Sequence, residues 1–351
     1  MAMHQPKRLF FFGGTEIDRP FIAAVAARLG LPLVIRRSGL VYRMLDCLPQ
    51  PLARLRSMRR MAQIISPWVE AIEITLVTGP NDIMLIRNIR TAISYLVACD
   101  PLRQSRPEVF LTWFTMKGQP PAKWSAIYHR ALLRALRIFV YTPRECITYA
   151  RWFGVPPSTF SLMVLEAPPI PVLQNLKPPL QAEVIMTGET NRDWATFLNI
   201  CRHLPHLSFV AVMPAEQAKE MPSLPNLKTL ERLPFPDYCE LIRCAKIQMI
   251  LVQDKGVAAG QRDFLLAGRL GVPMIATAVE SLQLYAANAE GALFVRQGDV
   301  AGACDAINRL LADAGLQTTL STSLKRRIEE HHSIEMVSSH WANILRSTIR
   351  D

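Results

Sequence analysis

Short apolar runs alternate with stretches of helical periodicity along the chain. Near the N-terminus, an apolar run over 8–12 ends at Gly13 and Gly14, helically spaced apolar residues cover 21–29, and a second run covers 31–35. This order predicts a strand, a glycine turn, a helix and a strand. Such a βαβ unit places its turn at the carboxyl end of a parallel strand.

The same order returns in the second half, where a strand and glycine turn over 182–189 precede a helix over 194–204 and a strand over 207–213. The alternation continues in both halves, which predicts an α/β protein with two Rossmann-like parallel sheets. The predicted strands are 8–12, 31–35, 71–79, 108–114 and 137–142 in the first half, and 182–188, 207–213, 227–233, 247–253, 272–277 and 292–298 in the second.

A proline-rich stretch over 167–181 separates the two halves. It contains five prolines and no apolar periodicity. Proline fixes φ and removes a backbone donor, so this stretch is the best linker. We therefore expect an N-terminal domain over 1–166, a C-terminal domain over 182–332, and a terminal helix over 333–351 that packs back on the first domain.

Composition narrows the class of protein. The chain has 351 residues, of which 50% are hydrophobic and 20% charged, which excludes a disordered chain, a collagen repeat and a disulfide scaffold. Its seven cysteines form no CxxC pair, which is typical of reduced thiols in a cytosolic protein. No apolar stretch is long enough for a signal-peptide core or a membrane span, so we expect a cytoplasmic protein with at most peripheral membrane contact.

The net charge of +11 is unevenly distributed. Residues 1–170 hold 22 Lys and Arg against 10 Asp and Glu, a net +12, whereas 171–351 hold 18 against 19. A basic face on the first domain would meet nucleic acid, an anionic lipid or a phosphorylated substrate. The chain has no helix-turn-helix, RNP or zinc-finger pattern, so nucleic acid ranks last.

Two basic stretches also carry apolar residues at helical spacing. The first, over 52–65, contains Arg54, Arg56, Arg59 and Arg60, and the second covers 123–137. A basic amphipathic helix can lie on an anionic bilayer, here the inner face of the cytoplasmic membrane. The alternative is that the apolar faces pack on the sheet while the arginines are solvated.

A glycine loop in the second half suits an anionic ligand. Gly260 follows an apolar strand and opens a helix that ends near Gly271. The first N–H groups of such a helix can approach a phosphate closely, and the helix dipole favours its charge. Gln261 and Arg262 could add side-chain donors, although a simple helix start is the plainer interpretation.

A series of glycine-containing motifs follows in a fixed order in the second half. Gly271-Val272-Pro273, Gly291–Val295 and Gly298-Asp299 come one after another, downstream of the segments at 187–198 and 230–252. In this order and spacing, residues 135–335 resemble retaining GT-B glycosyltransferases of the family 4 type. The resemblance implies two Rossmann-like domains facing across a cleft. The second domain would bind a UDP- or GDP-linked sugar and the first a saccharide or lipid-linked acceptor in cell-surface glycan synthesis.

The resemblance also implies a set of site residues. Arg192 would neutralise the donor diphosphate, and Leu233 and Tyr238 would bracket the base. The donor side comprises Gly188, Glu189, Arg192, Leu233, Tyr238, Gly260, Gln261, Arg262 and Asp263, and the acceptor side comprises Gly13, Gly14, Thr15 and Lys117. No DxD motif stands at a strand end, so we expect a metal-independent enzyme with no cofactor. No catalytic base is assigned.

One departure from the family pattern is clear. The family has two glutamates eight positions apart, and the corresponding positions here are Ala258 and Leu266. Asp263 stands one helical turn before Leu266 and could substitute for the second carboxylate. The missing carboxylates motivate an alternative function, a catalytically degenerate GT-B binding or partner subunit.

Overall fold

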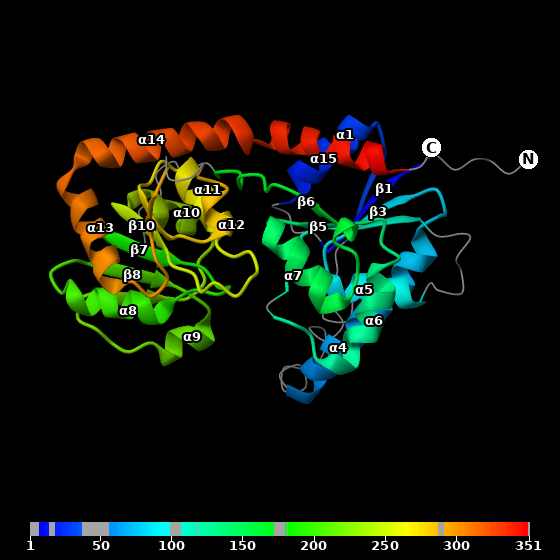
Figure 1. Cartoon of the computed structure of the whole chain (residues 1–351), viewed down its shortest axis with the longest axis horizontal. Helices are drawn as coiled ribbons and strands as arrows, with labels where there is room; N and C mark the ends of the chain where they lie inside the picture. The colour runs from blue at the N-terminus through cyan, green and yellow to red at the C-terminus, as the bar shows by residue number, and fades with distance from the viewer. Residues whose placement is uncertain are drawn as a thin grey trace, which may run out of the picture. The chain divides into compact units, whose positions relative to one another are not determined.

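The structure is a computed structural model that describes residues 7–13, 18–36, 56–98, 107–116, 118–171, 180, 182–286 and 291–349, without the side chains of 56–60. The chain divides into two compact units (Figure 1). The first contains Met1–Met163 and Ser338–Asp351, and the second contains Val164–Val337.

The first unit is built on a six-stranded sheet in the order β2-β1-β3-β4-β5-β6, with every neighbouring pair parallel. Its strands are β1 (Leu9–Phe12), β2 (Leu33–Arg36), β3 (Ile83–Ile86), β4 (Glu108–Leu111), β5 (Arg137–Val140) and β6 (Phe160–Leu162). The helices are α1 (Arg19–Leu29), α4 (Arg56–Val77), α5 (Ile89–Ala98), α6 (Ala122–Leu132), α7 (Pro143–Phe153) and most of α15 (Ile334–Thr348), with a 3-10 turn, η2 (Pro157–Thr159).

Aromatic rings bring the C-terminal helix into the first unit. Trp341 of α15 is fully buried, and its ring centroid lies 5.1 Å from Phe21, 5.1 Å from Trp113 and 5.4 Å from Phe139. Arg28 at the end of α1 also donates to Ser339 Oγ at 2.7 Å. Burial of so large a side chain fixes α15 against α1 and the sheet.

The predicted strand over 71–79 is wrong. Residues 71–77 form the last turns of α4, where Thr75 donates to the Ala71 carbonyl, and Thr78, just after the helix, donates to the Ile74 carbonyl. The β-branched composition favours a strand locally, but Ala71 and Ile74 are buried at helical spacing, so tertiary packing overrides it. The central strand is instead β3, in the short apolar run that follows, and β6 was also not predicted.

The second unit has its own six-stranded sheet in the order β12-β11-β10-β7-β8-β9, again parallel throughout. Its strands are β7 (Val184–Thr187), β8 (Phe209–Val212), β9 (Leu227–Leu230), β10 (Ile247–Ile250), β11 (Met274–Thr277) and β12 (Leu293–Val295). The helices are α8 (Trp194–His203), α9 (Ala215–Glu220), α10 (Phe235–Cys244), α11 (Gln261–Arg269), α12 (Glu280–Gln283), α13 (Val300–Ala312) and α14 (Ala314–His331).

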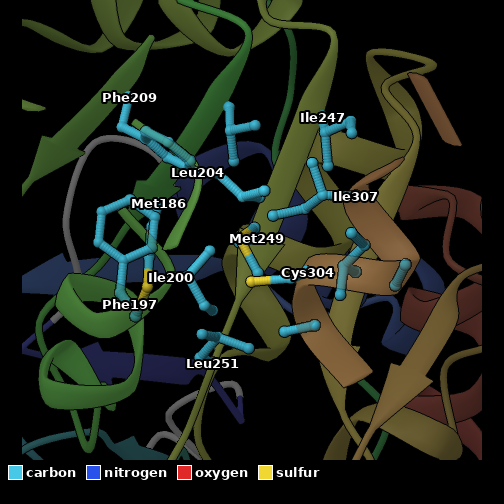
Figure 2. Packing of buried hydrophobic residues seen from close by; sticks show 14 of the residues in the cluster. Met186, Phe197, Ile200, Leu204, Phe209, Ile247, Met249, Leu251, Cys304 and Ile307 are labelled. Carbon is cyan, nitrogen blue, oxygen red and sulfur yellow. The ribbon is translucent and has the colours of Figure 1, made fainter. Parts of the chain in front are cut away.

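Alternate residues of this sheet point into one apolar cluster (Figure 2). Met186 of β7 and Met249 of β10 meet Phe197 of α8 and Ile307 of α13 there, so α8 and α13 cover one face. The intervening residues, such as Gln248, point to the opposite face. Both predicted parallel sheets are therefore confirmed, and all six strands predicted for the second half are present.

Residues just before the predicted linker over 167–181, and the first residues of that linker, are hydrogen-bonded within the second unit. Tyr285 Oη lies 3.2 Å from the Leu165 nitrogen, and His332 Nδ1 lies 2.9 Å from the Leu165 carbonyl oxygen. Arg269 of α11 adds a hydrogen bond of 2.9 Å to the Pro168 carbonyl. These bonds explain why the units divide after Met163, a few residues before the expected boundary at 166, with the second crossing at Val337.

Candidate functional site

Four of the predicted donor-site residues meet at the carboxyl edge of the second sheet. The segments that follow β7, β9 and β10 contribute them, together with the first turn of α11. Ligands of open α/β sheets bind at this edge, because the loops there are free to vary over a rigid sheet.

Gly188 and Arg192 form the turn after β7. Gly188 has φ +118°, and the Arg192 side chain folds over it. Arg192 donates from Nε to the Thr187 carbonyl at 2.7 Å and from Nη1 to the Thr190 carbonyl at 2.9 Å. With its side chain 3% exposed, Arg192 forms the floor of this turn and not a free surface cation.

Arg192 is paired with a carboxylate from the next helix. Its Nη2 contacts Asp263 Oδ2 in a partly buried ion pair, and Tyr238 Oη donates to Asp263 Oδ1 at 2.8 Å. Burial, and then the Asp263 charge, raise the pKa of Tyr238 well above its usual value, so it remains a donor near neutral pH. Gly188, Arg192, Tyr238 and Asp263 therefore form one network from three separate segments.

Backbone bonds hold this network in register with the sheet. The Asp193 nitrogen donates to the Leu251 carbonyl at 2.9 Å, and Gln253 donates to the Asn191 carbonyl at 2.8 Å. Asp193 also caps α8 by accepting from the Thr196 nitrogen at 3.2 Å. The turn after β7 is thus fixed to the end of β10. Within this turn Asn191 adopts a left-handed conformation, at φ +53°, although it is not glycine.

The first turn of α11 presents backbone N–H groups at the same edge. Gly260 is the N-cap at φ +88°, and an added Cβ would lie 3.0 Å from Ile250 Cγ2, so the position suits glycine alone. Gln261 is buried, and its Nε2 has no hydrogen-bond partner among the described residues. A helix N-terminus with an unpartnered buried amide is suited to an anionic ligand.

Three of the predicted donor-site residues lie apart from the Arg192 network. Arg262 lies 3.7 Å from Glu166, the residue before the predicted linker. Glu189 pairs with Arg232 on the surface, where both side chains are exposed. Leu233 is half-buried between β9 and α10. The structure does not join these side chains to the Arg192 network.

Polar residues that the sequence analysis did not select also belong to this edge. Gln248 is fully buried in β10, donates to Thr187 Oγ1 at 3.1 Å, and has an unpartnered Oε1 within the described structure. Asn191 likewise has an unpartnered Nδ2 there. The sequence does carry a signal for Gln248, because it is a polar residue within an otherwise apolar strand.

The two positions that lack carboxylates are buried. Ala258 is 5% exposed and Leu266, on α11, is 2% exposed. Asp263 is the carboxylate of α11 that reaches the network, and it does so as the partner of Arg192 and Tyr238.

On the acceptor side only Gly13 lies within the described residues; Gly14, Thr15 and Lys117 lie outside them. Gly13 ends β1 at φ +85°, and a Cβ there would lie 3.4 Å from the Asn88 nitrogen. Arg87 in the adjoining segment pairs with buried Asp18 and lies over the Trp113 ring, 5.2 Å from its centroid.

The described residues contain no group of His, Cys, Asp or Glu side chains that could hold a metal ion. Five cysteines lie in the described part, and none of them forms a disulfide: Cys146, Cys201, Cys239, Cys244 and Cys304. Cys47 and Cys99 lie outside it. Burial raises the pKa of Cys201 and of Cys239 to about 12, which keeps both thiols protonated.

No protein-family model matches the sequence, and a search of curated protein sequences gives no match either. Solved structures do match along nearly the whole chain. They include a glycosyltransferase from Rickettsia africae, with 11% identity, a TM-score of 0.67, and coverage of 98% of this chain and 99% of that one.

HepE from Anabaena, in complex with UDP and glucose, gives 9% identity and a TM-score of 0.66 over 97% of this chain and 100% of that one. A UDP-forming α,α-trehalose-phosphate synthase from Burkholderia vietnamiensis gives 12% identity and a TM-score of 0.64, over 98% of this chain and 99% of that one. At such low identity the similarity establishes the fold. The two parallel sheets and their match over both units give this chain the fold of the GT-B glycosyltransferases.

Proposed function

We propose that the protein is a hexosyltransferase-like glycosyltransferase that moves a sugar from a UDP- or GDP-linked donor to a saccharide or lipid-linked acceptor. The observation that carries the proposal is the Arg192–Asp263–Tyr238 network beside the N-terminus of α11. HepE, which has the same fold, is described with UDP and with UDP-glucose. The donor therefore binds at the carboxyl edge of the second sheet.

The main chemical demand of this reaction is the departing nucleoside diphosphate. The bond from the anomeric carbon to the diphosphate oxygen breaks, the acceptor oxygen bonds to that carbon, and the acceptor loses its proton. The backbone N–H groups at the start of α11 and the Gln261 amide would bind the diphosphate oxygens as their charge grows. We propose that these groups perform the neutralisation without a metal ion.

Arg192 has a double role in this proposal. Three of its N–H directions meet Thr187, Thr190 and Asp263, and a guanidinium carries five N–H donors. The remaining donors and the charge favour the diphosphate, while Asp263 and Tyr238 hold the side chain in one position. The network is thus preorganised before the donor binds.

The acceptor belongs to the first unit in this proposal. The net charge of +12 over 1–170 favours a phosphorylated or lipid-linked acceptor in cell-surface polysaccharide synthesis. The protein would then act in the cytoplasm, on the inner face of the cytoplasmic membrane.

The test is turnover of UDP- and GDP-sugars by the purified chain in the presence of EDTA. We expect nucleotide release with EDTA present, and a loss of at least 100-fold in kcat/KM in Arg192→Ala. Arg202→Ala, which removes an exposed arginine of α8, is the matched control and should keep full activity. Full activity of Arg192→Ala would remove Arg192 from the site.

The alternative is a catalytically degenerate GT-B subunit that binds a ligand or partner. The buried alanine and leucine at the two carboxylate positions favour it. Isothermal titration separates the possibilities: UDP or GDP binding together with turnover supports the enzyme, and nucleotide binding without turnover of any donor supports a binding subunit. Binding of neither nucleotide would exclude a donor site and favour a partner subunit.

A further inference from the structure

One helix of the first unit exposes a continuous apolar surface. Along α4 the side chains of Met61, Ile64, Ile65, Trp68, Ile72 and Leu76 are between 43% and 79% exposed. These six residues, which we call the α4 stripe, account for six of the 14 exposed large hydrophobic residues identified in the described structure. Ile64 and Ile65 are adjacent, and the other steps are three or four residues, which places all six on one side of the helix.

The opposite side of α4 provides the packing that the fold requires. Ala62, Ser66, Glu70 and Ile74 are buried at four-residue spacing, and α4 packs on α5 (Figure 1). Glu70 accepts hydrogen bonds from Ser66 and from Thr91 of α5. The α4 stripe therefore faces away from the core.

An apolar outer face is unusual for a helix that is exposed only to water. The outer face of an amphipathic helix is normally polar, and large apolar patches mark sites of interaction with proteins or membranes. From Met61 to Val77 the only charged residues are Glu70, which is buried, and Glu73. The outer face thus has the composition of a surface that becomes covered.

The charge around the stripe indicates what covers it. Arg56, Arg59 and Arg60 occupy the first two turns of α4, with side chains outside the described part, and Arg54 precedes the helix outside the described residues. The first 170 residues carry a net +12. We propose that the α4 stripe is a membrane-docking surface that inserts into the interface of an anionic lipid bilayer.

This occupant fits both features of α4. Its apolar side chains would enter the boundary between headgroups and acyl chains, while the basic end of the helix meets anionic headgroups. Trp68 lies in the middle of the stripe, and tryptophan favours this interface because its ring is apolar and its N–H is polar. A second protein copy would use the apolar surface but would gain nothing from the excess of positive charge.

The experiment is flotation of the whole 351-residue chain with large unilamellar vesicles. One set of vesicles is pure phosphatidylcholine, and the other contains about 30% anionic phosphatidylglycerol. We expect binding to the anionic vesicles at least 10-fold stronger than to neutral ones. The double variant Ile64→Glu/Ile72→Glu should lose at least 10-fold of that binding. Ile147→Glu, an exposed isoleucine of α7, is the matched control and should bind as wild type.

Trp68 provides a direct readout of insertion. Its fluorescence, taken as wild type minus Trp68→Phe, should shift to shorter wavelength with anionic vesicles and be quenched by brominated lipid. Circular dichroism should show that every variant is folded, as expected for substitutions at exposed sites. Equal vesicle binding by wild type and the double variant, or an unchanged Trp68 emission, overturns the proposal. A wild-type dimer that the double variant dissociates, without vesicle binding, assigns the stripe to a second copy and also overturns it.

Discussion

Gly188 and Arg192 occupy the same small volume at the end of β7: the guanidinium of Arg192 lies where a Cβ on residue 188 would be. Glycine at this position therefore does more than permit the turn at φ +118°. It leaves room for a buried cation that reaches Asp263 on another element. The geometry of the proposed donor site depends on a missing side chain.

Gly188→Ala should destabilise the second unit and displace Arg192. The added methyl group meets both an unfavourable backbone conformation and the guanidinium, so we expect a loss of about 3 kcal/mol in the free energy of unfolding. Gly298→Ala is the control, because Gly298 has φ +76° but nothing within 4 Å of an added Cβ, and it should lose about 1 kcal/mol. Urea denaturation measures both. Equal losses would show that Arg192 moves aside without cost.

Arg192 and Asp263 should be energetically coupled. Their side chains are 3% and 18% exposed, and removal of one partner leaves the other charge buried and uncompensated. We expect Arg192→Met and Asp263→Asn each to cost about 3 kcal/mol, and the double variant to cost about as much as either alone. Asp263→Asn keeps an acceptor for Tyr238, so the cycle isolates the charge. Additive losses measured in urea would contradict the pairing.

The sequence predicted most of the fold because parallel strands buried on both faces are short apolar runs that local reading detects. The strand containing β10 was predicted from its apolar residues, although Gln248 within it is polar. The failures occurred where local composition and tertiary packing disagree. Residues 71–79 have the β-branched content of a strand, yet Ile74 is buried as part of a helix that begins 18 residues earlier, at Arg56.

The candidate site was only partly predictable. Gly188, Arg192, Tyr238 and Asp263 were selected one by one through a family resemblance, but the contact between Arg192 and Asp263 spans 71 positions of the sequence. No local pattern encodes such a pair. The sequence carries no sign of the partner of Arg262 either, because Glu166 stands 96 positions earlier, just before the predicted linker, and meets α11 only in the folded unit.

His332 should make the stability of the second unit depend on pH. Burial lowers its pKa from 6.5 to about 4, and its Nδ1 lies 2.9 Å from the Leu165 carbonyl, which the neutral ring can meet as a donor. The unfolded chain binds this proton more readily, so the stabilisation is complete above pH 6.5 and is lost as the pH falls toward 4. Between pH 8 and pH 5 the loss is about 2 kcal/mol.

Urea denaturation of wild type and His332→Gln at these two pH values isolates this contribution. The variant should show a pH-dependent loss smaller by about 2 kcal/mol, since glutamine does not titrate. His203→Gln, at an exposed position of α8, controls for the removal of a histidine and should follow wild type. An identical pH dependence in all three proteins would mean that His332 does not remain neutral in the folded unit.

Leu266→Glu tests what the missing family carboxylate means for this chain. If the position still faced the donor, glutamate would be solvated by the site and would tighten UDP or GDP binding. Leu266 is instead 2% exposed, so we expect a carboxylate there to cost about 3 to 5 kcal/mol of stability and to add no activity. Leu266→Met, which conserves volume, should cost less than about 1.5 kcal/mol. Thermal denaturation and nucleotide titration of both variants decide the matter. A stable Leu266→Glu protein with tighter nucleotide binding would mean that position 266 faces the nucleotide. An unstable one means that α11 keeps this position in the core and that Asp263 is the carboxylate of α11 at the site.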